Sequence, residues 1–207
     1  MPEYIRKSPV EMPLTPASRE RKNGWDVVLA YEGQGEGPWL VDLSHLTKYD
    51  VQDRDLARLS PWGRAIPAQP GQTLWEEGLV INRQNRTQAS VWLLGPEELP
   101  PPADPAFTET TDGLCLLALT GRGVLALTER LTRLDLAAPG LAWPRVLQGP
   151  AAHVPCQVVP LAREGDTATV LLAFSRGYGR TLTEAVLATG AGLGLTPGGW
   201  EVLPFAA

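Results

Sequence analysis

The sequence predicts an α+β protein made of two lobes, and three observations carry this prediction. Short apolar runs that resemble strands alternate with turn-forming residues through the first half of the chain. A proline-rich segment at 96–107, which includes three consecutive prolines, interrupts this pattern. Beyond it, a strand, a glycine-containing turn and an amphipathic helix occur twice, because 117–120 (Leu-Ala-Leu-Thr) aligns without gaps with 172–175 (Leu-Ala-Phe-Ser).

The repeat defines the second lobe. Downstream of the aligned strands, 127–129 (Leu-Thr-Glu) matches 182–184 (Leu-Thr-Glu), and both copies continue with apolar residues at helical spacing. A further strand is expected between the copies, at 152–161. Two β-α units with an intervening strand predict a split β-α-β sandwich of the ferredoxin-like kind.

The domain boundaries follow from composition. Four prolines predict an extended N-terminal arm at 1–23, which either docks on a partner or frays as a terminus. The first α+β lobe is expected at 24–95, the stiff proline-rich connector at 96–107, and the second α+β lobe at 108–207.

Within the first lobe, a strand at 25–31 leads into the glycine-rich loop 32–37. Two glutamates and a following strand argue against a phosphate cradle, so the loop is interpreted as a hairpin. A short helix is expected at 54–59. A second hairpin joins the runs 78–81 and 89–94 through a polar turn.

Charge and composition exclude several classes of function. A net charge of −5 and a pI near 5.1 argue against a nucleic-acid partner, which requires clustered Lys and Arg. No apolar run reaches the ~20 residues that span a bilayer, so no membrane association is expected. Cys115 and Cys156 lack metal-ligand spacing and are expected to be free thiols in the cytoplasm. Two isolated histidines do not predict a metal site.

The most specific pattern is Asp42-Leu43-Ser44-His45, which follows an apolar run and precedes a second extended segment. It resembles the Asp-x-Ser-His signature of the folate-binding aminomethyltransferase superfamily, which includes the glycine cleavage T-protein and the gamma subunit of heterotetrameric sarcosine oxidase. The resemblance covers roughly residues 25–200. It implies a fold of two ferredoxin-like β-α-β lobes without the C-terminal barrel of full-length T-proteins, and it implies tetrahydrofolate as a cofactor.

Two departures from the family pattern bear on function. The aminomethyltransferases carry a catalytic carboxylate on the hairpin that matches 78–94, whereas Thr87, Gln88 and Ala89 occupy the corresponding positions here. A group that cannot change charge near neutral pH cannot shuttle the proton. The glutamate that holds the pterin in the family corresponds to Glu164 or Asp166, and the register between these two stays open.

The candidate cofactor-binding residues combine the motif, possible stacking groups and an anion site. Asp42, Ser44 and His45 come from the motif, Tyr49 and Trp92 offer stacking faces, and Arg180 lies in a turn that could hold a carboxylate. Some of these residues also have a purely structural interpretation. His45 could be a turn residue, the aromatic residues could belong to the core, and the turn at Arg180 could cap a helix. No catalytic residue is assigned.

Two functions remain after this comparison. The first is a non-catalytic gamma-type subunit that packs against larger flavin-containing subunits of a sarcosine-oxidase-like amine oxidase. The second is a stand-alone tetrahydrofolate-binding protein or aminomethyltransferase of one-carbon metabolism, in which Asp42, Asp50 or Glu164 replaces the lost acid.

Overall fold

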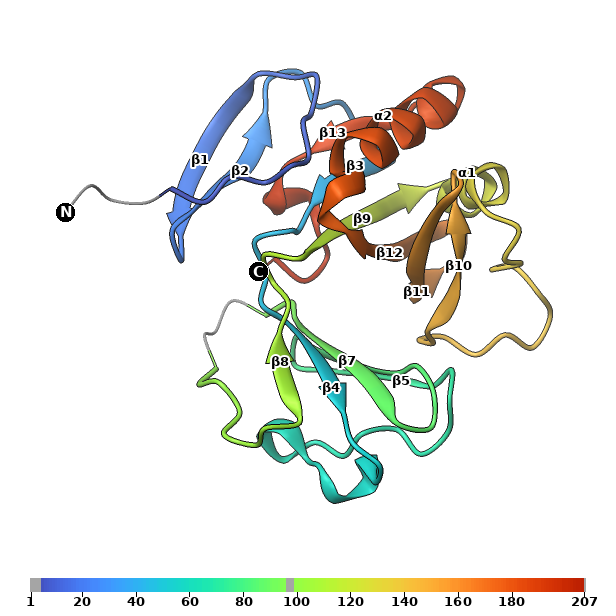
Figure 1. Ribbon diagram of the computed structural model, residues 1–207. Coiled ribbons are helices and arrows are strands. Elements are labelled where there is room, and N and C mark those ends of the chain that lie inside the picture. The colour runs from blue at the N-terminus through green and yellow to red at the C-terminus, as the bar shows by residue number, and fades with distance from the viewer. Residues whose placement is uncertain (1–4, 96–98, 207) are drawn as a thin grey trace.

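The computed structural model describes residues 5–95 and 99–206, which form two stacked lobes with a β-hairpin beside the upper one (Figure 1). The upper lobe contains a six-stranded sheet and two α-helices, and the lower lobe contains a five-stranded sheet. The α+β class predicted from the sequence is confirmed. None of the helices in the described residues has the length and hydropathy needed to cross a bilayer.

The six-stranded sheet has the order β10-β11-β12-β9-β3-β13. Its strands are β3 (Trp39–Asp42), β9 (Leu114–Arg122), β10 (Leu147–Ala151), β11 (Val154–Glu164), β12 (Thr167–Ser175) and β13 (Thr196–Gly198). Helix α1 (Val124–Leu131) follows β9, and helix α2 (Gly179–Gly190) follows β12. The predicted repeat is therefore two β-α units, and β3 is inserted between the first unit and β13.

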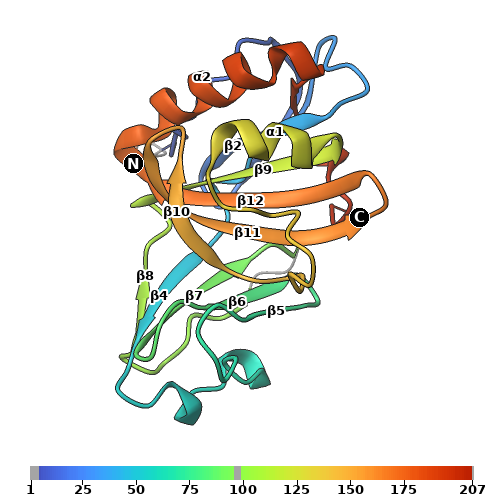
Figure 2. The ribbon, with the colours of Figure 1, turned by 90° about the vertical axis from the view of Figure 1, so that its right-hand side faces the viewer.

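The packing of strand β9 explains why its sequence is apolar without interruption from Leu114 to Leu119. Cys115, Leu117 and Leu119 pack into the core beneath α1 and α2, whereas Leu116 and Ala118 pack into a second core shared with the five-stranded sheet. A strand whose two faces are both covered needs a continuous apolar run. Figure 2 shows the two helices on one side of the six-stranded sheet and the lower lobe on the other.

The five-stranded sheet has the order β5-β6-β7-β4-β8. Its strands are β4 (Lys48–Gln52), β5 (Thr73–Glu76), β6 (Leu79–Arg83), β7 (Gln88–Leu93) and β8 (Phe107–Glu109). The predicted hairpin at 78–94 is confirmed as the antiparallel pair β6 and β7. The short helix expected at 54–59 is a single 3-10 turn, η1 (Leu56–Arg58), and a second 3-10 helix, η2 (Pro61–Gly63), follows it.

The remaining elements surround the upper lobe. Strands β1 (Pro16–Lys22) and β2 (Trp25–Tyr31) pair with each other, so the predicted N-terminal arm contributes a strand. The 3-10 helices here are η3 (Arg176–Tyr178), η4 (Ala191–Leu193) and η5 (Trp200–Val202). The hairpin expected at 32–37 is wrong, because β2 pairs with β1 whereas the next strand, β3, pairs with β9 and β13.

The strands are divided between the lobes differently from the predicted boundaries. Strand β3, from the predicted first lobe, lies in the sheet of the second lobe, and β8, at the start of the predicted second lobe, lies in the sheet of the first. The chain therefore crosses between the sheets at 43–47 and again at 110–113. Part of the predicted connector, 96–98, lies outside the described residues. Composition locates breaks in secondary structure, but it does not determine which distant strands pair.

Candidate functional site

The Asp-Leu-Ser-His motif forms the first crossing between the two sheets. Asp42 ends β3, and its Oδ1 accepts a hydrogen bond of 2.9 Å from the backbone N–H of Ser44. The backbone N–H of Leu46 donates to the carbonyl of Leu43 at 3.0 Å. An aspartate side chain that caps the amide two residues later is a standard way to start a turn. The motif is therefore a turn that redirects the chain from one sheet to the other.

Ser44 attaches this turn to β9. The backbone N–H of Leu43 donates to the carbonyl of Leu116 at 2.8 Å, and the backbone N–H of Leu116 donates to Ser44 Oγ at 3.2 Å. The serine hydroxyl thus takes the place of a backbone acceptor where the pairing of β3 and β9 ends. Ser44 is buried and completes the sheet at its boundary.

Lys48 is a residue of the site that the sequence did not single out. Its side chain is fully buried, and Nζ donates to the carbonyls of Ser44 at 2.9 Å and Leu46 at 2.6 Å. Burial lowers the pKa of Lys48 to about 8, against the opposing effect of carboxylates that include Asp42. Alternation along β4 groups Lys48 with the polar residues Asp50 and Gln52, so no sequence pattern marked it as buried.

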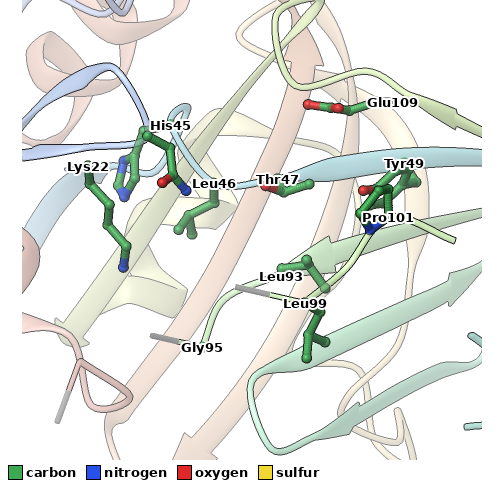
Figure 3. A pocket seen from close by; sticks show the side chains of 11 residues that line it. Lys22, His45, Leu46, Thr47, Tyr49, Leu93, Gly95, Leu99, Pro101 and Glu109 are labelled. Carbon is green, nitrogen blue, oxygen red and sulfur yellow. The ribbon is translucent and has the colours of Figure 1, made fainter. Parts of the chain in front are cut away.

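A pocket of about 180 Å³, here called the His45 pocket, adjoins the turn (Figure 3). His45 and Lys22 lie at one end, and Tyr49 and Pro101 lie at the other. Among the described residues, the lining is formed by Lys22, Asn23, His45, Leu46, Thr47, Tyr49, Leu93, Gly95, Leu99, Pro101 and Glu109. The structure thus brings together two predicted site residues, His45 and Tyr49, with the charged residues Lys22 and Glu109.

His45 is held neutral by its surroundings. Its ring packs edge-on against Trp200, with 5.6 Å between ring centroids, and its Nε2 is buried with no hydrogen-bond partner among the described residues. Burial, reinforced by the charges of Lys22 and Lys48, lowers the pKa of His45 to about 3. At neutral pH this imidazole can donate or accept a hydrogen bond, but it does not carry a proton to a substrate.

A second cavity, of about 460 Å³, is lined by Asp42 and shares none of the described residues with the His45 pocket; it is here called the Asp42 cavity. It is enclosed by the N-terminal segment, the β1–β2 hairpin, β3 and β13. Burial raises the pKa of Asp42, and the hydrogen bonds from Ser44 and Ser8 only partly oppose this. Burial together with the negative charge of Asp42 raises the pKa of Tyr31 to about 12.

The other predicted site residues lie elsewhere. Trp92 is fully buried in the core between the two sheets. Glu164 is exposed at the end of β11, and Arg180 is exposed at the start of α2, where Nε donates to Glu184 at 2.8 Å. The residues Glu164 and Arg180 lie at opposite ends of β12. The structure therefore groups Asp42, Ser44, His45 and Tyr49, and it separates Glu164 and Arg180 from them. Trp92 lies opposite Lys48 in the neighbouring strand, but it is buried in the core.

The β6–β7 hairpin carries amides where the family pattern has a carboxylate. Gln88, the first residue of β7, donates through Nε2 to Asp50 Oδ1 at 2.8 Å, and Gln52 donates through Nε2 to Asp50 Oδ2 at 2.5 Å. Asp50 lies on the neighbouring strand β4, and both of its oxygens are occupied by these amides. Within 5–95 and 99–206, no group of three His, Cys, Asp or Glu side chains is arranged to hold a metal ion.

The fold with this turn at its centre is that of the aminomethyltransferase type, as two solved structures show. One is a chain of the heterotetrameric sarcosine oxidase from Corynebacterium sp. U-96 in complex with pyrrole 2-carboxylate; the TM-score is 0.62 at 12% identity, over 81% of this chain and 85% of that one. The other is the glycine cleavage system aminomethyltransferase T from Bartonella henselae, with a TM-score of 0.59 at 18% identity.

The second match covers 90% of this chain but 57% of the aminomethyltransferase, so this chain spans little more than half of that protein's length. No protein-family model and no curated protein match the sequence. The resemblance predicted from the Asp-x-Ser-His motif is thereby confirmed at the level of the fold.

Proposed function

We propose that this chain is a non-catalytic, gamma-type subunit of a hetero-oligomeric, sarcosine-oxidase-like amine oxidase linked to folate. The observation that carries the proposal is the β6–β7 hairpin. Thr87, Gln88 and Ala89 stand where an aminomethyltransferase needs a free carboxylate, and Asp50 is already held by two glutamine amides. A transferase of this type requires a group that can gain and lose a proton near the reacting amine.

The extent of the structural matches supports a subunit. The sarcosine oxidase chain is covered over 85% of its length, whereas the aminomethyltransferase is covered over 57%. The first of these proteins is a heterotetramer. A chain that matches one component of such an assembly over most of that component's length fits the role of a component, with the larger flavin-containing subunits as its proposed partners.

Tetrahydrofolate remains the proposed cofactor, with the His45 pocket as part of its site. At about 180 Å³ this pocket is smaller than the ~300–1,000 Å³ typical of sites that enclose a ligand. A partner subunit would therefore have to supply the rest of the walls. His45 and Tyr49 would line this chain's share, while Asp42 and Ser44 shape the turn that positions them.

We also propose a cytoplasmic location. Cys115 and Cys156 are unpaired and buried, and burial raises the pKa of each thiol to about 11. Thiols in this state fit a compartment in which disulfides do not form.

The second candidate is a stand-alone tetrahydrofolate-binding protein or aminomethyltransferase. It is favoured by Asp42, a carboxylate beside a cavity whose pKa is raised by burial, as the pKa of a general acid often is. In this case the isolated chain would turn over a folate-linked substrate, and Asp42→Asn would abolish turnover while leaving the fold intact.

The test is purification of the tagged chain from its host at native expression level, followed by intact mass measurement and an absorbance scan. We expect a stoichiometric larger partner with a flavin spectrum, and folate binding by the whole complex. A chain that emerges alone and colourless would contradict the subunit proposal. Folate-dependent turnover by that isolated chain, lost in Asp42→Asn, would establish the second candidate.

A further inference from the structure

The Asp42 cavity combines an apolar interior with a charged rim. Its inner walls are formed by the partly or fully buried side chains of Val10, Met12, Val28 and Val41. Lys7, Glu11, Arg19 and Asp26 are exposed and lie around its opening. At about 460 Å³, the cavity falls within the range of sites that hold small molecules.

The interior contains the side chain of Asp42, a carboxyl group whose pKa is raised by burial. A cationic ligand would stabilise its ionised form. At the rim, Arg19 and Asp26 form an ion pair with each other. Asp42 forms no ion pair with any of the described residues. The nearby cation Lys48 is directed at two carbonyl oxygens, those of Ser44 and Leu46. Hydrogen bonds from Ser44 and Ser8 and the charge of Lys48 partly stabilise the ionised form of Asp42, but they do not outweigh the effect of burial.

Tyr31 supplies a second polar group in the same cavity. It lies at the end of β2 and is half-buried, and its raised pKa keeps the phenol protonated at all physiological pH values. A neutral phenol retains an oxygen that accepts a hydrogen bond. A carboxylate and a phenol oxygen, set among aliphatic side chains, match a ligand with a cationic N–H group and a short hydrocarbon body.

We propose that the Asp42 cavity binds a small organic ammonium ion, with Asp42 as its counter-ion, the Tyr31 hydroxyl as a second acceptor, and the aliphatic walls around its alkyl group. This site is separate from the His45 pocket, because the two cavities share no lining residue within the described parts of the chain. Every residue in it belongs to this chain, so binding requires no partner subunit and does not depend on the proposed function.

The test is a calorimetric titration of the full chain at pH 7 and low ionic strength with three probes of similar size: propylammonium, 1-propanol and propionate. We expect saturable binding of propylammonium. The affinity for 1-propanol should be lower by about tenfold or more, since a charge-assisted hydrogen bond contributes that factor. Propionate should not bind. Tighter binding of propionate than of propylammonium would overturn the proposal and indicate an anion site at Lys7 and Arg19.

Two variants locate the binding. Asp42→Asn keeps an oxygen that can accept from the N–H of Ser44, so the turn should persist, and the affinity for propylammonium should fall about tenfold or more. The matched control is Glu11→Gln, which removes a rim carboxylate and should change the affinity less than about twofold. Unchanged affinity in Asp42→Asn would overturn the proposal.

A third variant covers the case in which Asp42→Asn does not fold. Tyr31→Phe removes one acceptor and no charge, and it should weaken propylammonium binding several-fold. If the wild-type chain shows no saturable binding of propylammonium, or if Tyr31→Phe binds as tightly as the wild type, the proposal is wrong. None of these outcomes depends on whether the chain purifies with a larger subunit.

Discussion

Four consecutive residues at the start of the β3–β4 connection have different roles. Asp42 caps the turn and faces one cavity, Leu43 and Ser44 bond to β9, and His45 faces the other cavity. Lys48 then ties the turn together from inside by donating to two of its carbonyls. Because Asp42, Leu43 and Ser44 all form hydrogen bonds and His45 packs against Trp200, the motif is constrained as a unit. This constraint holds whether or not a cofactor binds.

The first prediction concerns His45. Its pKa is about 3 in the folded chain and near 6.5 in the unfolded chain, so the unfolded state binds the proton more readily between these values. The free energy of unfolding should therefore be greatest above pH 6.5 and fall as the pH drops toward 3, with a contribution from His45 on the order of a few kcal/mol. Chemical denaturation at several pH values measures this change in the free energy of unfolding.

The matched control is the other histidine. His45→Gln should remove much of the loss of stability between pH 6.5 and pH 4, whereas His153→Gln, in the turn between β10 and β11, should retain it. Carboxylates also titrate in this range, but they are common to both variants. Equal pH slopes in the wild type and His45→Gln would show that His45 is not buried in neutral form.

At the scale of elements, covered faces determine the sequence of the central strands. Strand β9 is buried on both faces, and β7 places Val91 and Leu93 against the loops of the lower lobe while Trp92 faces the upper sheet. The chain packs in four successive layers: helices, six-stranded sheet, five-stranded sheet and the loops with η1 and η2. Only the outermost layers have a solvent-facing side, so the helices show amphipathic periodicity and the central strands do not.

The second prediction tests the close approach of the C-terminal segment to β2. Gly199 lies directly before η5, and a Cβ at this position would overlap the carbonyl oxygen of Leu29 and approach Ala30 N to 2.5 Å. These are backbone atoms, which cannot move without displacing the strand. Gly199→Ala should therefore lower the free energy of unfolding by about 2–3 kcal/mol, the upper part of the range for overpacking.

Gly192 in η4 is the control, because a Cβ there meets nothing within 4 Å and its backbone is not in the left-handed region. Gly192→Ala should be neutral or stabilising by up to ~1 kcal/mol. Urea denaturation of both variants measures the difference. Similar free energies for the two variants would contradict the predicted contact between η5 and β2.

At the scale of the whole molecule, the two lobes share one core. The shared cluster contains Val80, Trp92 and Leu94 from the lower lobe, together with Leu116 and Leu171 from the upper sheet. Polar bonds add to it, since Ser90 Oγ donates to Gln157 Oε1 at 2.8 Å across the lobes. The chain also crosses twice between the sheets, because residues 48–109, which form the whole five-stranded sheet, are inserted between β3 and β9 of the six-stranded sheet.

The third prediction is that the lobes unfold together. Exposing the shared core would cost each lobe its apolar contacts with the other, so a stable single lobe is not expected. Calorimetry should give one transition whose calorimetric and van't Hoff enthalpies agree, and it should coincide with the transition followed by tryptophan fluorescence. Two separate transitions would show that the sheets are independent domains.

The sequence by itself determined the α+β class, the repeated β-α unit, the β6–β7 hairpin and the importance of the Asp-Leu-Ser-His turn. These features depend on local periodicity and turn chemistry, which are encoded over a few neighbouring residues. The absence of a carboxylate at Gln88 can likewise be read directly from the sequence, because it depends only on which residue occupies the position.

Only the tertiary structure decided which strands share a sheet, that Lys48 is buried, and that Glu164 and Arg180 lie far from His45. It also revealed the two cavities, one lined by His45 and the other by Asp42. Strand β3 joins the upper sheet because its hydrogen-bond partners, β9 and β13, come from residues 114 to 198. Pairing over such separations follows from the packing of the whole chain, and local sequence preferences do not specify it.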